Sequence, residues 1–123
     1  MPDSPSDLLP LHKDTFHILV ALADRDRHGY SIMQDIAART NGQIRLSPST
    51  LYSAVKRMLE NGLIEELDDR SAPEHDDERR RYYRITGFGR KVAIAEARRL
   101  ERLLADARAT GLVPKSGLAP KRL

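Results

Sequence analysis

The stretch from Ser47 to Ile64, SPSTLYSAVKRMLENGLI, constrains the fold most, because it carries both the start signal and the stop signal of a short helix. Ser47 is a favoured N-cap residue, and Pro48 suits the first helical position, where its missing N–H is not needed. Gly62 can adopt the left-handed conformation that ends many helices. The sequence therefore predicts a helix from Pro48 to Asn61.

This predicted helix has two different faces. The apolar residues, spaced as on one buried stripe, are Leu51, Val55, Met58 and Leu59. The outer face carries hydroxyl and basic side chains, namely Ser49, Thr50, Ser53, Lys56 and Arg57. Hydroxyls in the first turns with bases behind them suit a recognition helix in the major groove of DNA. Because any surface helix has a polar outer face, the neighbouring elements must decide between these interpretations.

Two further helices are predicted before this one. Residues 13–24, KDTFHILVALAD, form an apolar helix, and Ile18 and Leu22 widen its stripe. The stripe itself consists of Phe16, Leu19, Val20 and Ala23. Its width indicates burial on more than one side, partly against a second subunit. Residues 30–40 form the second predicted helix. Ser31 and Gln34 are spaced as a capping box, but a helix start one or two residues earlier fits equally well.

The segment RDRHG between these helices is predicted to be a turn. Three short helices in succession favour a helix-turn-helix core. After Gly62 the pattern changes to short runs of strand-forming residues, LIEELDD from residue 63 and RYYRIT over residues 81–86. The charged residues between them contain no core positions. The sequence therefore predicts a two-stranded β wing after the helical core, and a mainly α (α+β) fold.

The tip of the predicted wing joins an acidic run, Glu74 to Glu78, to three arginines, Arg79, Arg80 and Arg81. In one interpretation the opposite charges only screen each other in solvent. In the other, the arginines contact DNA phosphates or the minor groove, and the acids shield them in the free protein. On the second interpretation, replacing Arg79 and Arg80 by Ala should weaken binding to all DNA sequences equally.

A long helix is predicted from Phe88 to Thr110, before Gly111. Its apolar seam, with alternating steps of four and three residues, consists of Ala93, Ala97, Leu100, Leu104 and Ala107. Such a seam can pack on the core of its own chain. A small winged domain offers little surface for so long a helix, however. We therefore expect it to form a homodimer, packing on its mate and on the first helix through Phe16 and Leu19.

Composition bounds the remaining function classes. The 123 residues suit one small domain, and 21 Lys and Arg against 18 Asp and Glu give a net charge of only +3. There is no cysteine, and the four histidines have no metal-ligand spacing. No serine lies in a nucleophile-elbow pattern. We therefore expect no catalytic residues, no metal site and no cofactor.

The sequence also lacks targeting signals. Residues 1–10 are acidic and proline-rich, without the basic and apolar regions of a signal peptide, and we expect them to be mobile. No apolar run approaches the roughly 20 residues that a membrane span needs. We therefore expect a cytoplasmic protein with no membrane contact.

Three segments carry a family resemblance: FHILVALADRDRHGYSIMQDI, LSPSTLYSAVKRMLENGLIEE and DDERRRYYRITGFGRKV. Together they resemble the PadR family of bacterial transcriptional regulators over roughly residues 11–110. In that family a glycine-tyrosine pair opens the second helix, and a threonine-leucine-tyrosine triplet lies in the recognition helix. The single long C-terminal helix is similar to the compact branch of the family.

The resemblance implies a winged helix-turn-helix homodimer that binds promoters as a repressor or sensor. The residues that it places against DNA are Ser49, Thr50, Tyr52, Lys56, Arg57, Arg79, Arg80 and Arg81, with Tyr30 at the helix-turn-helix entrance. By helical geometry Tyr52 lies at the edge between core and groove. The expected domains are residues 11–86 for DNA binding and 87–111 for dimerisation, with a mobile tail at 112–123.

The expected partners are double-stranded DNA, bound at a palindromic operator, a second copy of the chain, and a small-molecule effector of unknown identity. With no Trp and only two Phe, the chain offers little for an aromatic stacking pocket. The rival interpretation is a winged-helix module whose basic faces bind an acidic protein partner without specific DNA binding. Salt and sequence dependence separate the two, because phosphate contacts release counterions and base contacts discriminate between sites.

Overall fold

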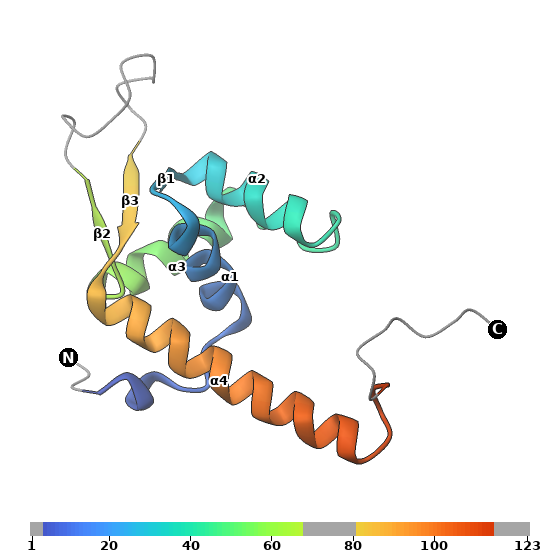
Figure 1. The fold of residues 1–123 in the computed structure, drawn as a ribbon. Helices are drawn as coiled ribbons and strands as arrows, with labels where there is room; N and C mark the ends of the chain where they lie inside the picture. Colours follow the sequence, from blue (N-terminus) through green and yellow to red (C-terminus); the bar gives the residue numbers. More distant parts are fainter. Residues whose placement is uncertain (1–3, 68–80, 115–123) are drawn as a thin grey trace.

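A computed structural model of the chain describes residues 4–67 and 81–114. The elements in chain order are η1 (Pro5–Leu8), α1 (Lys13–Asp24), β1 (Arg27–His28), α2 (Gly29–Arg39), α3 (Pro48–Glu60), β2 (Ile64–Glu66), β3 (Tyr82–Ile85) and α4 (Gly87–Ala109). In Figure 1, α1, α2 and α3 form a compact group, β2 and β3 extend to one side of it, and α4 runs beneath it. The fold is a mainly helical winged helix, as the sequence predicts.

The core lies where α1, α2, α3 and the sheet meet. Its fully buried large side chains are Ile18, Leu19, Leu22, Ile32, Ile36, Leu51, Met58, Leu63 and Val92. Both predicted helical stripes contribute to this core, and the side chain of Ala54 joins them. Leu19 is completely buried within the chain and belongs to this core; its predicted contact with a second subunit stays a prediction.

The sheet has three strands rather than two. The order is β1-β3-β2, with both pairs antiparallel. Ile64 pairs with Ile85 in the predicted hairpin, while Arg27 and His28 pair with Tyr83 and Tyr82. The prediction of a simple turn at RDRHG is therefore incomplete, because two of its residues complete the sheet. This pairing ties the start of α2 to the wing.

The start of α2 also differs from the predicted capping box. The helix begins at Gly29, and the Nδ1 atom of His28 accepts a hydrogen bond from the Ser31 backbone N–H at 3.2 Å. The imidazole of His28 thus does what a Ser or Asp side chain usually does at an N-cap. Ser31 is consequently inside the first turn and is not the cap.

A charged network fixes α1, β1 and α2 relative to one another. The Arg27 guanidinium donates to the Ala21 carbonyl oxygen at 3.0 Å and to the Ser31 hydroxyl at 3.0 Å. It also pairs with Asp24 at 3.0 Å and Asp35 at 3.1 Å. Arg27 is largely buried, and these partners satisfy its donors, as a desolvated guanidinium requires.

The junction between the wing and α4 depends on Thr86. Its hydroxyl donates to the Gly62 carbonyl oxygen at 2.6 Å and accepts from the Gly89 N–H at 2.9 Å, which caps α4. Gly89 lies so close to the Leu63 carbonyl that no side chain fits at this position. The direction of α4 is therefore fixed relative to the end of α3.

Residues 4–10 lie against the packed domain; the mobility expected of residues 1–10 stays a prediction. The leucines of this segment, Leu8 and Leu9, pack against the core. Leu11 donates its backbone N–H to the buried Glu96 carboxylate of α4. Arg99 pairs with the same carboxylate at 2.6 Å. Residues 1–3 and 115–123 of the predicted mobile ends lie outside the described residues.

Candidate nucleic-acid interface

The outer face of α3 presents the side chains that its sequence predicts. Ser49, Thr50, Ser53, Lys56 and Arg57 are all exposed. The buried side consists of Leu51, Ala54, Val55 and Met58. The predicted division of the helix into a packed face and a free face is therefore confirmed. The role of the free face in DNA binding stays a prediction.

The first turn of α3 is held by its own hydroxyl groups. The Ser47 hydroxyl accepts a hydrogen bond from the Thr50 N–H at 3.2 Å, as predicted for the N-cap, and donates to the Thr50 hydroxyl oxygen at 3.0 Å. Because Thr50 accepts in this contact, its own hydroxyl proton remains available to an outside acceptor. A base edge or a phosphate can supply that acceptor.

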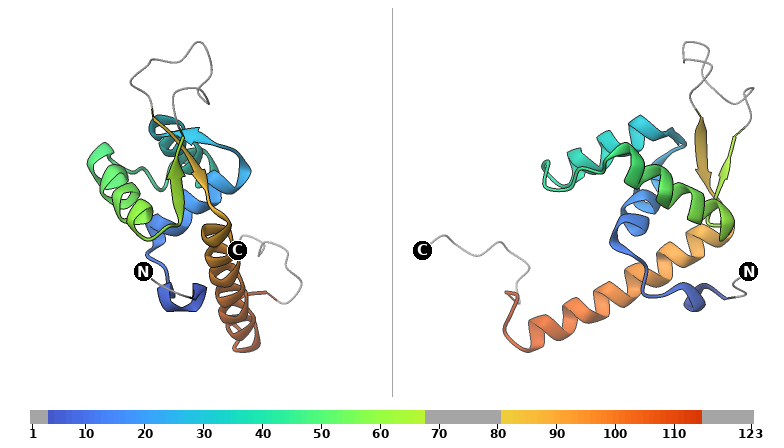
Figure 2. Two further views of the ribbon diagram at one scale, coloured as in Figure 1. Left: turned by 90° about the vertical axis from the view of Figure 1, so that its left-hand side faces the viewer. Right: turned by 180° about the vertical axis from the view of Figure 1, so that it is seen from behind.

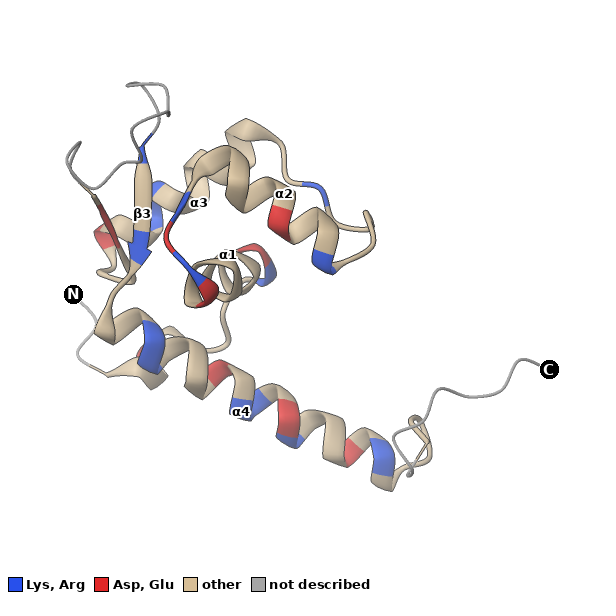
Figure 3. Cartoon of the chain, turned by 45° about the horizontal axis from the view of Figure 1, so that its top comes forward, with Lys and Arg blue, Asp and Glu red and all other residues tan. Residues whose placement is uncertain are grey.

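Lys56 and Arg57 form no ion pair within the described part of the chain, unlike many other arginines of this protein. Arg27, Arg39, Arg84 and Arg99 are each paired with a carboxylate. In Figure 3, α3 and β3 lie near each other and both carry basic residues. The basic residues of α4 alternate with acidic ones. Among residues 4–67 and 81–114, the unpaired positive charge near the wing therefore lies on α3.

Tyr52 connects α3 to the first residue of α2. Its side chain is 48% exposed, and its hydroxyl group lies against the Cα of Gly29. A Cβ at Gly29 would overlap the Tyr52 hydroxyl and would come within 2.9 Å of its Cζ atom. Tyr30, beside Gly29, is 57% exposed. Tyr30 thus lies in the first turn of α2, and Tyr52 of α3 lies against that turn. Tyr52 is half-exposed, at the edge between the core and the surface.

Of the three wing arginines predicted to contact DNA, Arg81 lies within the described residues. Arg81 is exposed but pairs with Glu66 of β2 at 3.3 Å. Arg79, Arg80 and the acidic run 74–78 lie outside the described residues. Within β3, Arg84 binds Asp26 at 2.9 Å, and this hydrogen bond raises the pKa of the Arg84 guanidinium.

The other strand residues stabilise the base of the wing. Tyr82 packs edge-on against His28 with ring centroids 5.3 Å apart and planes at 88°. Tyr83 is buried, and this burial raises the pKa of its hydroxyl. The wing is therefore anchored to the start of α2 through aromatic contacts as well as strand pairing.

Sequence reasoning missed the roles of four residues that shape this surface. Arg27 of β1 and Asp35 of α2 form an ion pair that the sequence pattern does not predict. Gly29 can be read from the sequence, but only the structure shows why this position needs a glycine: a side chain there would overlap the Tyr52 hydroxyl. Arg45 is exposed just before α3 and has no ion pair among the described residues.

A second surface, here called the α1–α4 groove, lies on the other side of the domain. It has a volume of 200 Å³ and is lined by Phe16, Leu19, Val20, Ala23, Ile85, Arg90, Ala93, Ile94 and Ala97. The structure thus brings together four of the residues predicted for dimerisation. Leu19 forms the buried floor, and Ile94, which the prediction missed, is 47% exposed.

The C-terminal half of α4 extends beyond the other elements, as both views of Figure 2 show. Its apolar residues lie one or two turns apart on one stripe of the helix: Leu100, Leu103, Leu104 and Ala107. The leucines are 37%, 57% and 41% exposed. Leucines so exposed on a projecting helix mark an interaction surface rather than part of a core.

No helix of the described residues is long and apolar enough to cross a membrane. Within the same residues, no group of three or more His, Cys, Asp or Glu side chains is arranged to hold a metal ion.

The three-helix core, the wing and the long last helix define a winged helix-turn-helix protein. Residues 18–95 match the model of the transcriptional regulator PadR-like family. The chain therefore belongs to this family, as the sequence motifs predict, and is a PadR-family transcriptional regulator.

Individual relatives agree with this assignment. The chain is 34% identical over 87 residues to the transcriptional regulator Rv3488 of Mycobacterium tuberculosis, an alignment that covers 71% of this chain and 75% of the relative. A transcriptional regulator of Clostridium thermocellum has a similar structure, with a TM-score of 0.66 and 30% identity over 80% of this chain and 92% of that one. A PadR-family regulator of Clostridium difficile shares the fold, with a TM-score of 0.66 and 23% identity over 80% of this chain and 98% of that one.

Proposed function

We propose that the protein is a sequence-specific repressor that binds a palindromic operator as a homodimer and carries out no catalysis. The observation that carries this proposal is the outer face of α3, where Thr50, Lys56 and Arg57 are exposed and the two bases have no carboxylate partner among the described residues. A base that is already paired must give up its carboxylate before it can pair with a phosphate, whereas Lys56 and Arg57 need not. This face is therefore suited to meet phosphates and base edges.

The assignment of DNA contacts follows from the position of each residue. Ser49, Thr50 and Ser53 on the first turns of α3 would meet base edges, and Lys56 and Arg57 would meet phosphates. Tyr30 in the first turn of α2, and Tyr52 of α3 beside it, would contact the DNA backbone. Arg81 would have to exchange Glu66 for a phosphate, while Arg79 and Arg80 retain the role expected from the sequence.

The homodimer is supported by two apolar surfaces that the single chain leaves uncovered. The α1–α4 groove lies near the start of α4, and the leucine stripe lies near its end. In a twofold dimer with antiparallel α4 helices, the stripe of each protomer can reach the groove of the other. Such a self-complementary contact is the usual form of a C2 interface.

A twofold dimer has a consequence for the operator. The two recognition helices would enter successive major grooves on one side of the duplex, about 34 to 36 Å apart. The operator should then contain two inverted half-sites with centres roughly 10 base pairs apart. Because its target is chromosomal DNA, we propose a cytoplasmic location.

The test is hydroxyl-radical footprinting on the DNA upstream of the coding sequence. The proposal expects two protected half-sites related by a dyad, on one face of the duplex. Protection of a single asymmetric site would contradict the dimer model. No protection, combined with capture of an acidic protein partner, would support the interaction-module interpretation instead.

The repressor role needs a separate readout. A reporter placed behind the footprinted promoter should gain expression when the gene for this protein is deleted. It should lose that gain when the wild-type gene is restored, but not when the Lys56→Ala gene is restored. Lower expression after deletion would mean that the protein is an activator.

A further inference from the structure

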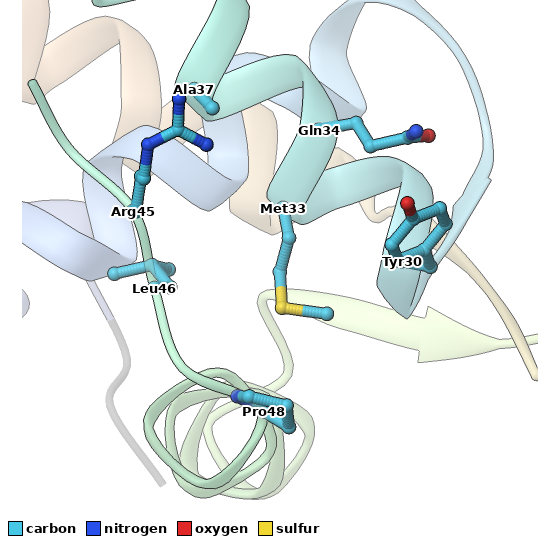
Figure 4. Close-up of a pocket in the computed structure, with 7 residues that line it drawn as sticks. All are labelled: Tyr30, Met33, Gln34, Ala37, Arg45, Leu46 and Pro48. Atoms are coloured by element: carbon cyan, nitrogen blue, oxygen red, sulfur yellow. The ribbon is translucent and has the colours of Figure 1, made fainter. Parts of the chain in front are cut away.

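A recess of 360 Å³ lies between α2 and the segment that leads into α3 (Figure 4). Met33 and Ala37 of α2 line one side, and Leu46 and Pro48 line the other. This volume falls within the roughly 300 to 1,000 Å³ of small-molecule sites. The recess is separate from the α1–α4 groove, with which it shares no lining residue.

The polar groups of the recess lie at opposite ends. Figure 4 shows the Arg45 guanidinium beside Ala37 on one side, the Tyr30 and Gln34 side chains on the other, and the Met33 thioether between them. A ligand that binds Arg45 and extends over Met33 toward Pro48 would therefore meet a positive charge at one end. Its middle would contact only apolar atoms.

Arg45 is available to such a ligand. Its side chain is exposed, and it has no ion pair within the described residues. The guanidinium lies over Gly42, with Nη2 3.1 Å from the place that a Cβ would occupy, so the glycine leaves room for it. None of the residues lining the recess is acidic. An anion at this end would thus meet no competing carboxylate.

The α1–α4 groove is less suited to an anion. Its basic residue, Arg90, already lies within 3.5 Å of the Ala23 carbonyl oxygen. Its other lining residues are all apolar, and the proposed dimer would cover them. Charge complementarity therefore favours the recess at Arg45.

We infer that this recess binds a small organic anion of the medium-chain carboxylate class, and that the bound anion excludes DNA. The inference rests on the proposed function, because it makes the anion the effector of the regulator. The carboxylate would pair with Arg45, a charge-assisted contact, while its alkyl chain would cover Met33, Leu46 and Pro48. Flexible Met and Leu side chains adapt well to an unbranched chain.

Exclusion of DNA follows from shared residues. Tyr30 lines the recess and is also proposed to contact the DNA backbone. Pro48 lines it too, and the next two residues, Ser49 and Thr50, are proposed to read bases. A ligand held between Tyr30 and Pro48 would occupy the approach to the duplex.

The binding test is a titration of the full chain with octanoate as the probe, in the absence of DNA. Heteronuclear NMR spectra monitor the backbone amides during this titration. We expect saturable shifts of the amides of Met33, Ala37 and Leu46. Arg45→Gln should weaken octanoate binding about tenfold, the value of one charge-assisted contact. Arg102→Gln, which removes an exposed arginine from α4, is the matched control and should change nothing. Octanol, which lacks the charge, should bind wild type as weakly as octanoate binds Arg45→Gln.

Three results would overturn the site. They are the absence of saturable shifts, equal affinities for wild type and Arg45→Gln, and shifts confined to the α1–α4 groove around Phe16 and Ile94. Because this titration contains no DNA, its outcome is independent of whether the protein binds an operator.

The competition is tested by fluorescence anisotropy with the footprinted duplex. Octanoate should lower the DNA affinity of wild type and should lower that of Arg45→Gln at about tenfold higher concentration. Unchanged DNA affinity with the recess saturated would overturn the exclusion of DNA while leaving the proposed function intact. Failure of the protein to bind any duplex would contradict the proposed function, and the NMR titration would then decide the site alone.

Discussion

The Tyr52 hydroxyl on α3 lies directly against the Cα of Gly29, the first residue of α2. Any side chain at position 29 would overlap this hydroxyl, and the Cδ2 atom of Leu51 would be 3.2 Å away. The Tyr52 of the threonine-leucine-tyrosine triplet thus explains why the glycine-tyrosine pair begins with a glycine, Gly29. Together the two residues set how closely α3 approaches the start of α2.

Gly29→Ala should therefore destabilise the protein by about 1 to 2 kcal/mol, the usual cost of overfilling a packed site. In a Tyr52→Ala background the same change should cost much less, because the new methyl group fills vacated space. Chemical denaturation of wild type, Gly29→Ala, Tyr52→Ala and the double variant measures the coupling free energy between the two positions. Gly87→Ala is the control, because a Cβ there meets nothing within 4 Å. Equal losses in both backgrounds would show that Tyr52 does not constrain Gly29.

The buried Glu96 carboxylate makes stability depend on pH. The hydrogen bond from Arg99 outweighs burial and, together with the charge of Arg99 and the Leu11 N–H, holds the pKa of Glu96 below its ordinary value of 4.5. Because the folded-state pKa is the lower one, this stabilisation is fully present above pH 4.5 and is lost as the pH falls through the folded-state value.

Glu96→Gln should accordingly lower the free energy of unfolding most near neutral pH. The difference from wild type should shrink below pH 4.5, the ordinary value of the carboxyl pKa. Urea denaturation across a pH series measures it, with Glu101→Gln on the exposed side of α4 as the matched control. A difference that does not change with pH would contradict the role assigned to the Glu96 charge.

Lys56→Ala should weaken operator binding without changing thermal stability, because the side chain is exposed and forms no ion pair among the described residues. The slope of log affinity against log salt concentration should fall by about one, the value for a single phosphate contact. Lys91→Ala on α4 is the matched control for the loss of one exposed lysine. A large loss of stability in Lys56→Ala would show that the outer face of α3 has been assigned wrongly.

Leu104→Glu should shift the protein from dimer to monomer in sedimentation equilibrium, because it places a charge on the apolar stripe of α4 that we assign to the dimer. Ala105→Glu adds the same charge to an exposed position on the opposite side of the helix and should leave the dimer intact. If both variants dissociate equally, or neither does, the leucine stripe is not the contact between subunits.

The helices were predictable because their signals are local. Ser47, Pro48 and Gly62 bracket α3, and the spacing of Leu51, Val55 and Met58 gives its buried side. The same holds for the hairpin, whose two strands are separated by charged residues. These features depend on the nearest few residues, and the structure confirms them.

The features that sequence reasoning missed depend on residues far apart in the chain. β1 has only two residues and is defined by pairing with Tyr82 and Tyr83. His28 is not a usual N-cap residue, so local signals leave a capping box at Ser31 and an earlier start of α2 as alternatives, and the structure has the earlier start.

The central claim is tested most directly by titrating the protein onto its own upstream duplex and onto a scrambled duplex of equal composition, across a salt series. The account predicts tight binding to the upstream duplex alone, weakening steeply as salt rises. Equally weak binding to both duplexes at every salt concentration would contradict it.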